Sequence, residues 1–196
     1  MAEPAHHYTI ELHRAVFTEE LFEVYQKYEK AVHKKDRDRD QLKRFVCSSP
    51  VYDPDNENDR PMKERSAPYN FEKVDDFRSY KEEAIYPGPG SYHYYHRIDG
   101  KLIAMGVVDI TKRVVNSQYF IYDPEYSFLC MGVVGAIHEI EYMKMIQKNY
   151  NALLNDYQLG ELVYNCPKVN YKLNYKPGYL ICPRTKQKVL MDEAIK

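Results

Sequence analysis

The sequence contains no tryptophan, few cysteines and no long apolar run among its 196 residues. A helix that crosses a membrane needs roughly 20 consecutive apolar residues, so we expect no membrane contact. The first thirty residues carry several glutamates and no apolar stretch, which argues against a signal peptide. We therefore expect a cytoplasmic protein, with the nucleus as the alternative compartment.

The four cysteines are scattered and form no C-x-x-C pair. A local zinc site needs several closely spaced ligands, and a disulfide framework needs an oxidising compartment. The chain also has no phosphate-binding loop, no dinucleotide fingerprint and no G-x-S-x-G elbow. We expect no metal site and no cofactor held by this chain.

The order of elements predicts an α+β protein with a mixed, mostly antiparallel sheet and flanking helices. Thr18 is placed as the N-cap of a helix, and Asp99-Gly100 is a strong signal for a hairpin turn. We expect one domain over residues 1–196, with a flexible, proline-rich loop at 48–70. The expected strands are 8–12, 92–98, 101–109, 117–122, 159–164, 179–181 and 189–191, and the expected helices are 19–32, 41–47, 71–86 and 133–149.

One connection in this order is typical of acyltransferases that use acetyl-coenzyme A. In that fold a strand passes through a glycine-containing turn into a helix, next to a splayed following strand. Here the strand 117–122 leads into a helix that begins near Gly132-Val133-Val134-Gly135. Coenzyme A enzymes normally place Arg or Gln before the glycines, whereas this chain has Leu129-Cys130-Met131. An ordinary acetyl-coenzyme A enzyme is therefore the third hypothesis.

Basic residues dominate the segment from Tyr164 to Leu190. It holds six lysines and arginines, no acidic residue, and several tyrosines between the charges. Cations interleaved with aromatic rings are typical of surfaces that bind single-stranded or terminal nucleic acid. A solvated surface is the equally weighted alternative. The candidate nucleic-acid contacts are Lys168, Tyr171, Lys172 and Lys176.

Three segments together resemble the C-terminal domain of arginyl-tRNA–protein transferases. The first runs from Asp99 to Ile110, and the second contains Asp-Pro-Glu-Tyr-Ser at 123–127 and continues to Gly132-Val133. The third contains Tyr157, Gly160 and Cys166-Pro167-Lys168, and continues to Pro183. The N-terminal part agrees more loosely, at 17–20, 25–28, Val32-His33, Arg44-Phe45 and Ser49-Pro50.

The resemblance implies a variant of the acetyltransferase fold in which the aminoacyl end of tRNA replaces coenzyme A. Its co-substrate is arginyl-tRNA, and its acceptors are proteins with N-terminal Asp or Glu. Family members also carry an N-terminal domain with paired cysteines, which has no counterpart here, so a separate N-terminal domain is an expected partner. The runner-up hypothesis is a non-catalytic module of the same fold that binds tRNA or protein.

The resemblance also directs attention to residues around the second segment. Asp123 and Asp109 are candidates to accept a proton during transfer or to pair with the arginine guanidinium. A turn or cap role near a strand end is the equally weighted alternative for each aspartate. His93 is a candidate that faces the substrate, against the simpler reading of an ordinary strand histidine. The further candidates for substrate binding are Tyr119, Tyr122, Tyr126, Ser127 and Gly132.

The basic segment yields a prediction about salt. Each phosphate contact on a duplex adds a slope of about −0.9 in log affinity against log salt. Changing Lys168 and Lys172 together to Ala should flatten the measured slope for tRNA binding by roughly one to two. Unchanged affinity and slope, measured by filter binding between 50 and 300 mM salt (roughly the informative range), would mean that these lysines are only a solvated surface.

Overall fold

The computed structural model describes residues 5–48, 50–51, 86 and 88–195 of the chain. It divides into two compact units, residues 1–158 and 159–196, which are treated separately below. The single domain expected over 1–196 stays a prediction. The helix expected at 71–86 and most of the loop expected at 48–70 lie outside the described residues. In the described ranges, no helix is both long and apolar enough to span a bilayer.

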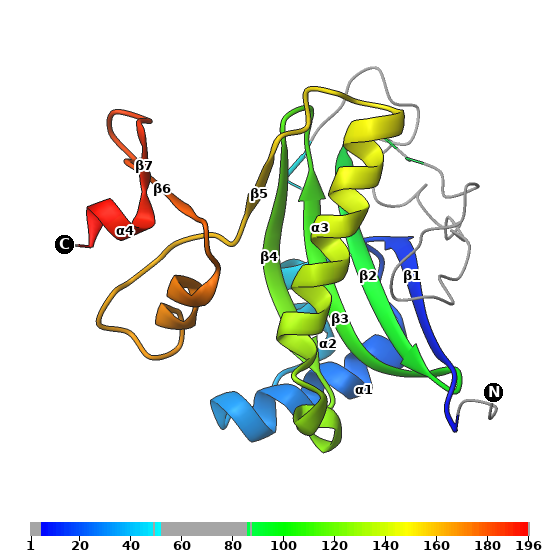
Figure 1. Cartoon of the computed structure of the whole chain (residues 1–196). Coiled ribbons are helices and arrows are strands. Elements are labelled where there is room, and N and C mark those ends of the chain that lie inside the picture. Colours follow the sequence, from blue (N-terminus) through cyan, green and yellow to red (C-terminus); the bar gives the residue numbers. More distant parts are fainter. Residues whose placement is uncertain (1–4, 49, 52–85, 87, 196) are drawn as a thin grey trace. The chain divides into compact units, whose positions relative to one another are not determined.

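The first unit is built on a five-stranded mixed sheet with the order β1-β2-β3-β4-β5 (Figure 1). The first four strands pair antiparallel, and β5 pairs parallel to β4. This arrangement confirms the expected α+β class. The strands are β1 (Tyr8–Arg14), β2 (Gly90–Ile98), β3 (Lys101–Ile110), β4 (Val114–Tyr122) and β5 (Asp156–Gln158).

The turn between β2 and β3 confirms the hairpin predicted from Asp99-Gly100. Both residues have positive φ, 50° and 82°, as a two-residue turn of the I′ type requires. A register shift at Val107/Val108 pairs Val107 with Tyr119 and Val108 with Ser117. The residue between them, Gln118, is therefore the extra residue of a β-bulge in β4.

One face of the sheet is covered by three consecutive helical segments, α1 (Glu19–Tyr28), η1 (Glu29–His33) and α2 (Arg39–Val46). The Thr18 side chain accepts the Leu21 N–H, which confirms the predicted N-cap. Asp38 and Gln41 form a capping box, so α2 begins two residues earlier than predicted. The core on this face joins the helices to β2, β3 and β4 through Leu21, Phe22, Leu42, Tyr95, Met105 and Ile121.

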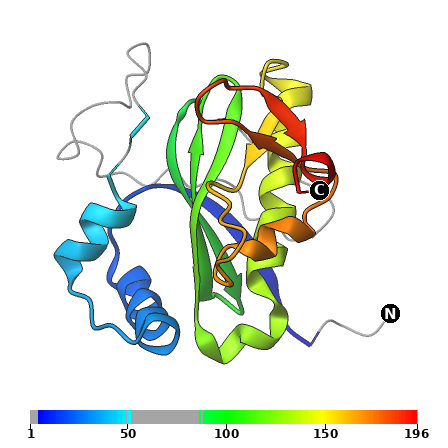
Figure 2. The same cartoon turned by 90° about the vertical axis from the view of Figure 1, so that its left-hand side faces the viewer.

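The other face is covered by α3 (Met131–Asn149), so the sheet lies between α3 and the α1–α2 pair (Figure 2). Its core contains Tyr92, Tyr94 and Ile110 of the sheet, packed against Tyr142 and Ile146 of α3. Gly135 has a packing role here, because a Cβ at that position would collide with the Phe120 ring. The second glycine of the motif at 132–135 therefore sets the distance between α3 and β4.

The strand predicted at 159–164 is wrong, and the strand lies earlier, at Asp156–Gln158. Gly160 has φ +72°, which breaks the extended chain directly after β5. Val163 is exposed, so the apolar residues that suggested a strand do not face a core. The order β4–α3–β5 nevertheless matches the expected connection of a strand, a helix and a splayed following strand. β5 is parallel to β4 and pairs only with the first three residues of β4.

The second unit is small and contains a two-stranded antiparallel sheet. Tyr179–Ile181 (β6) pairs with Lys188–Leu190 (β7), close to the predicted strands. The 3-10 segment η4 (Asn170–Asn174) precedes the hairpin, and α4 (Met191–Ala194) follows it. Met191 N–H donates to the Gly178 carbonyl, which fastens α4 to the start of β6.

A buried carboxyl on α3, that of Glu139, makes the stability of the fold depend on pH. Glu139 is buried over Gly106, and its Oε2 accepts the Tyr157 hydroxyl at 2.7 Å. Burial raises the pKa of Glu139 to about 7, although hydrogen bonds from Tyr157 and Ser117 oppose the rise. A carboxyl whose pKa is higher in the folded state contributes stability below its unfolded pKa and loses it as pH rises through 7.

We predict that Glu139→Gln removes this dependence. The difference in the free energy of unfolding, variant minus unchanged protein, should increase between pH 5 and 8, by at most about 3 kcal/mol. Urea unfolding at several pH values measures the difference. Glu141→Gln, an exposed neighbour on the same helix, is the control and should show no such trend. Parallel pH profiles for the Glu139 variant and the unchanged protein would contradict the prediction.

Candidate functional site

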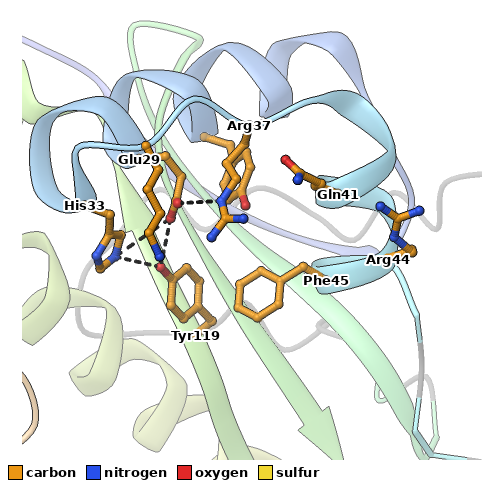
Figure 3. A pocket seen from close by; sticks show the side chains of 9 residues that line it. Glu29, His33, Arg37, Gln41, Arg44, Phe45 and Tyr119 are labelled. Atoms are coloured by element: carbon orange, nitrogen blue, oxygen red, sulfur yellow. Dashed lines mark hydrogen bonds and ion pairs between the residues drawn. The ribbon is translucent and has the colours of Figure 1, made fainter.

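A pocket of about 460 Å³ opens between the helical layer α1–η1–α2 and strand β4 (Figure 3). Every lining residue but Tyr119 comes from the helical layer and its loop. Figure 3 shows His33 at one end of the pocket and Arg44 at the other, with the rings of Tyr119 and Phe45 between them. The lining residues are Tyr25, Glu29, His33, Lys35, Arg37, Gln41, Arg44, Phe45 and Tyr119.

A buried carboxylate, that of Glu29, organises the pocket wall. Glu29 is only 3% exposed. Its Oε2 accepts Arg37 Nε at 3.1 Å, and its Oε1 accepts the Tyr119 hydroxyl at 3.3 Å. His33 Nε2 lies 3.1 Å from the Tyr119 oxygen and 3.8 Å from Glu29 Oε1. These contacts join η1, the following loop and β4 into one hydrogen-bonded network.

The backbone of η1 explains how Glu29 and His33 come together. The residues form a single π-helical turn directly after α1, and Lys34 ends it with φ 57°. Such wide turns occur mostly as short insertions in α-helices and often at functional sites. The turn directs Glu29 and His33 to the same Tyr119 side chain, although β4 lies 90 residues further along the chain.

The pocket is cationic. Three cations line it against one carboxylate, and that carboxylate is already bound to Arg37. Within the described part of the chain, the Arg44 guanidinium has no ion-pair partner. The Phe45 ring is 54% exposed and packs edge-on against Tyr119, with centroids 4.9 Å apart. The pocket can therefore bind an anionic group next to an aromatic wall.

Asp123 lies just beyond the end of β4 and is fully buried. Its Oδ2 accepts Lys27 Nζ at 2.8 Å and lies 3.6 Å from Lys101 Nζ, and its Oδ1 accepts the Glu125 N–H. Burial alone would raise the pKa of Asp123, but the hydrogen bond from Lys27 and the nearby charges outweigh it, and the pKa is lowered. Asp123 caps the 3-10 segment η3 (Pro124–Leu129) and joins it to α1 and β3.

Asp109 lies far from Asp123, at the other end of the β3–β4 pair. It pairs with Asn116 at the start of β4, whereas Asp123 bonds to the Ile103 carbonyl near the start of β3. Ile103 and Asp109 are six positions apart along β3, a distance of about 20 Å. Asp109 is buried and accepts hydrogen bonds from Ser91 and Gln118. The two aspartates therefore belong to separate places on the sheet, and neither lines the pocket.

The candidate tyrosines fall into two groups connected by Tyr28. Tyr119 lines the pocket, and its ring lies 6.2 Å from that of Tyr28. The Tyr122 ring centroid also lies 5.2 Å from that of Tyr28, and Tyr122 directly precedes Asp123. Tyr126 is on η3 with Lys101 Nζ 5.0 Å over its ring. Ser127 is next to it, and Gly132 is in the first turn of α3.

His93 does not reach the pocket. It is fully buried, and its Nε2 donates to the Val46 carbonyl at the end of α2 over 2.8 Å. Burial lowers the pKa of His93 to about 4, so the ring is neutral. His93 and His96 face opposite sides of the sheet. His93 bonds to Val46 at the end of α2, whereas His96 packs against Phe120 and against His138 of α3.

The basic candidates of the second unit have different surroundings. Lys168 is exposed. Lys172 donates to the Glu161 carbonyl at 2.7 Å, and burial lowers its pKa. Lys176 forms an exposed ion pair with Asp192 at 2.5 Å. Tyr171 is half exposed, with its ring 6.4 Å from that of Tyr175.

Most of the pocket was missed by reasoning from the sequence. Only Tyr119 was among the candidates, whereas Glu29, His33, Arg37 and Arg44 were given no role. The available signal was the loose agreement with the family at Val32-His33 and Arg44-Phe45. No local sequence pattern indicated that Glu29 and His33 contact Tyr119 of β4, which lies far along the chain.

Comparisons with known proteins agree with the resemblance. Residues 20–182 match the family described as "Arginine-tRNA-protein transferase, C terminus". The chain is 30% identical to arginyl-tRNA–protein transferase 1 of Dictyostelium discoideum over 98% of its own length and 40% of the relative. It is 34% identical to the Arabidopsis thaliana protein of that name over 89% of its length and 24% of the relative. The chain thus spans less than half of these relatives.

Two further similarities are more distant. Relatives from Campylobacter jejuni, named aspartate/glutamate leucyltransferase, are 28% identical over 46% of this chain and 35% of their own length. A solved structure, described as a possible acetyltransferase from Clostridium difficile 630, has a TM-score of 0.44 and 15% identity. It covers 89% of this chain and 95% of its own.

We predict that Asp123→Asn keeps the fold and lowers its stability. Asn preserves the size and the bond to the Glu125 N–H, but it loses the charge that binds Lys27. Hydrogen bonds to charged groups contribute about 1.5–3 kcal/mol. Because Lys27 is half exposed, the loss should lie at the lower end. The loss should disappear as pH falls through the lowered pKa of Asp123.

Urea unfolding at pH 7 and pH 3 measures this effect, and Asp36→Asn, whose carboxylate forms only an exposed ion pair with Lys30, is the control. The sequence-based hypothesis also expects the Asp123 variant to lose transfer activity. A folded variant of unchanged stability and unchanged turnover would leave Asp123 as a turn residue only.

Proposed function

Because this chain belongs to the arginine-tRNA-protein transferase family over residues 20–182, we propose that it transfers arginine from arginyl-tRNA to proteins. The acceptor is the N-terminal α-amine of a protein that begins with Asp or Glu. The family match supports the reaction class, and the printed name of the Campylobacter relatives supports an acidic acceptor. The reaction belongs in the cytoplasm, with the nucleus as the alternative compartment.

The cationic pocket is the observation that carries the acceptor assignment. An N-terminal Asp or Glu has a carboxylate that needs a positive partner and an amine that must stay accessible. Arg44 and Arg37 present guanidinium groups to the pocket, and guanidinium groups match the geometry of carboxylates. Glu29 fixes Arg37 in place, so less side-chain freedom is lost when the acidic group binds.

The chemistry needs little more than positioning. The aminoacyl ester of tRNA is already activated, and an α-amine with a pKa of about 7.7–8.0 is partly neutral at pH 7. Holding the amine against the ester therefore supplies much of the acceleration. No cofactor is needed in this scheme besides the co-substrate arginyl-tRNA.

The second unit supplies the tRNA contact in this proposal. Its cations from Lys168 to Lys188 are not interrupted by acids, and several tyrosines are exposed among them. A separate N-terminal domain, which the family resemblance implies, is a further partner in this proposal. It would add to tRNA or acceptor binding.

A transfer assay tests the function. Arginyl-tRNA labelled in the arginine is offered to the chain with a peptide that begins with Asp, alone and with the N-terminal domain of a relative. Label in the peptide supports the proposal. Bound tRNA without transfer in both cases would instead support the binding module, and binding of neither tRNA nor peptide would overturn both.

The pocket yields a more specific prediction. Arg44→Gln should raise KM for the Asp peptide roughly 10- to 150-fold, because it removes a charge-assisted hydrogen bond of about 1.5–3 kcal/mol. Arg113→Gln, an exposed arginine in the β3–β4 turn, is the matched control and should change nothing. An equal KM for the Arg44 variant and the control would remove this pocket from acceptor recognition.

A further inference from the structure

We propose that the hydrogen bond between Gln118 and Asp109 positions Tyr119 in the pocket, so that Gln118 and Asp109 are positioning residues for acceptor binding. The proposal rests on the proposed function and deepens it, because it names what fixes the strand side of the acceptor pocket. Three observations carry it: the bulge in β4, the partners of Asp109, and the contacts of Tyr119 in the pocket wall.

The bulge places two neighbouring side chains on one face of the sheet. Two adjacent residues of β3 pair with Ser117 and Tyr119, so Gln118 is the extra residue between them. Tyr119 packs against the core under the helical layer. Gln118 bonds to Asp109, which is two residues after Val107 of the same core and therefore on the same face. Bulges bend a strand and re-aim its side chains, so the direction of Tyr119 depends on how Gln118 is held.

Asp109 holds the Gln118 amide from a buried position. Asp109 is 3% exposed, and its Oδ2 accepts Gln118 Nε2 at 2.7 Å. Its Oδ1 accepts the Ser91 hydroxyl of β2. Both carboxylate oxygens are therefore used, and the neighbouring strands β2, β3 and β4 meet at this side chain. Hydrogen bonds to an ionised acceptor are stronger than those between neutral groups, so the extra residue of the bulge is held in one orientation.

Tyr119 transmits the geometry of the bulge to the pocket. Its hydroxyl donates to Glu29 Oε1 at 3.3 Å, and its oxygen lies 3.1 Å from His33 Nε2. Its ring packs edge-on against that of Phe45, the neighbour of Arg44 in sequence, with centroids 4.9 Å apart. Among the described residues that line the pocket, Tyr119 alone lies in a strand. The sheet therefore sets the positions of Glu29 and Phe45 through Tyr119.

A preformed wall lowers the cost of binding an acceptor. In the proposed function the acidic side chain of the acceptor binds Arg44, beside the rings of Phe45 and Tyr119. If Tyr119 is no longer held, the wall has to be ordered as the acceptor binds, and affinity falls. Arginyl-tRNA is assigned to the second unit and does not share this cost. Loss of the Gln118 hydrogen bond should therefore raise KM for the acceptor without changing kcat or KM for arginyl-tRNA.

Exchanging the two hydrogen-bonding groups tests the proposal. Gln118→Glu keeps the size of the side chain but places a carboxylate opposite that of Asp109. KM for the Asp peptide should rise about 2- to 13-fold, the cost of ordering one side chain. Adding Asp109→Asn should restore KM, because the new amide donates to the new carboxylate and its oxygen still accepts the Ser91 hydroxyl. Gln118→Ala, which loses the amide without adding a charge, should act like Gln118→Glu.

Gln147→Glu is the matched control. The Gln147 amide on α3 donates to Asn155 Oδ1 at 2.7 Å, outside both the bulge and the pocket, so this variant should change neither KM. A merely structural role of the Gln118 hydrogen bond would lower the stability in urea and leave KM of the folded variant unchanged. That result, or a double variant that fails to restore KM, would overturn the proposal.

A measurement without turnover separates this proposal from the proposed function. NMR of protein with isotope-labelled tyrosine follows the Tyr119 ring, whose resonance should move in Gln118→Glu and return in the double variant. An unmoved resonance would overturn the positioning role even if the unchanged chain transfers arginine. If the unchanged chain transfers nothing and the resonance moves as expected, the proposed function fails, and the Gln118 hydrogen bond is still what positions Tyr119.

Discussion

The ion pair between Glu29 and Arg37, buried on the Glu29 side, is the contact on which the pocket depends. It fixes the loop after η1 against the helical layer, and Glu29 in the same position accepts the Tyr119 hydroxyl from β4. A buried carboxylate is costly unless its oxygens are satisfied. Here both oxygens have partners, so the helical layer and the sheet are held in one geometry. This fixed wall leaves Arg44 and the Phe45 ring open to a ligand.

Asp123 at the end of β4 and Glu29 near its middle have the same role. Each is a buried carboxylate that joins the helical layer to the sheet. The Asp123 carboxylate joins α1 to β3 through Lys27 and Lys101 and begins η3. Both carboxylates are buried, and both are balanced by cations from elements distant in sequence. The α1 face of the sheet is therefore organised by two acidic anchors. If arginine is bound on this face, its guanidinium has to compete with lysines that already occupy Asp123.

Local signals predicted the parts of the fold that depend on neighbours in sequence. Thr18, with its hydroxyl, and the Asp99-Gly100 turn need only a few adjacent residues, and both are confirmed. The strand expected at 159–164 failed because β5 is defined by pairing with β4, which apolar residues alone do not reveal. The pocket was missed for the same reason, since Glu29 meets Tyr119 across 90 residues. Similarity to a family marked His33 and Arg44 but could not show that they share a cavity.

The pocket accounts for the acidic side chain of an N-terminal Asp or Glu, because the Arg44 guanidinium lies in it beside two aromatic rings. A crystal structure of the chain with a bound peptide that begins with Asp tests this placement most directly. We expect the Asp carboxylate within hydrogen-bond distance of the Arg44 guanidinium, beside the rings of Phe45 and Tyr119. A peptide bound outside the pocket, or in it with the Asp carboxylate away from Arg44, would contradict the placement.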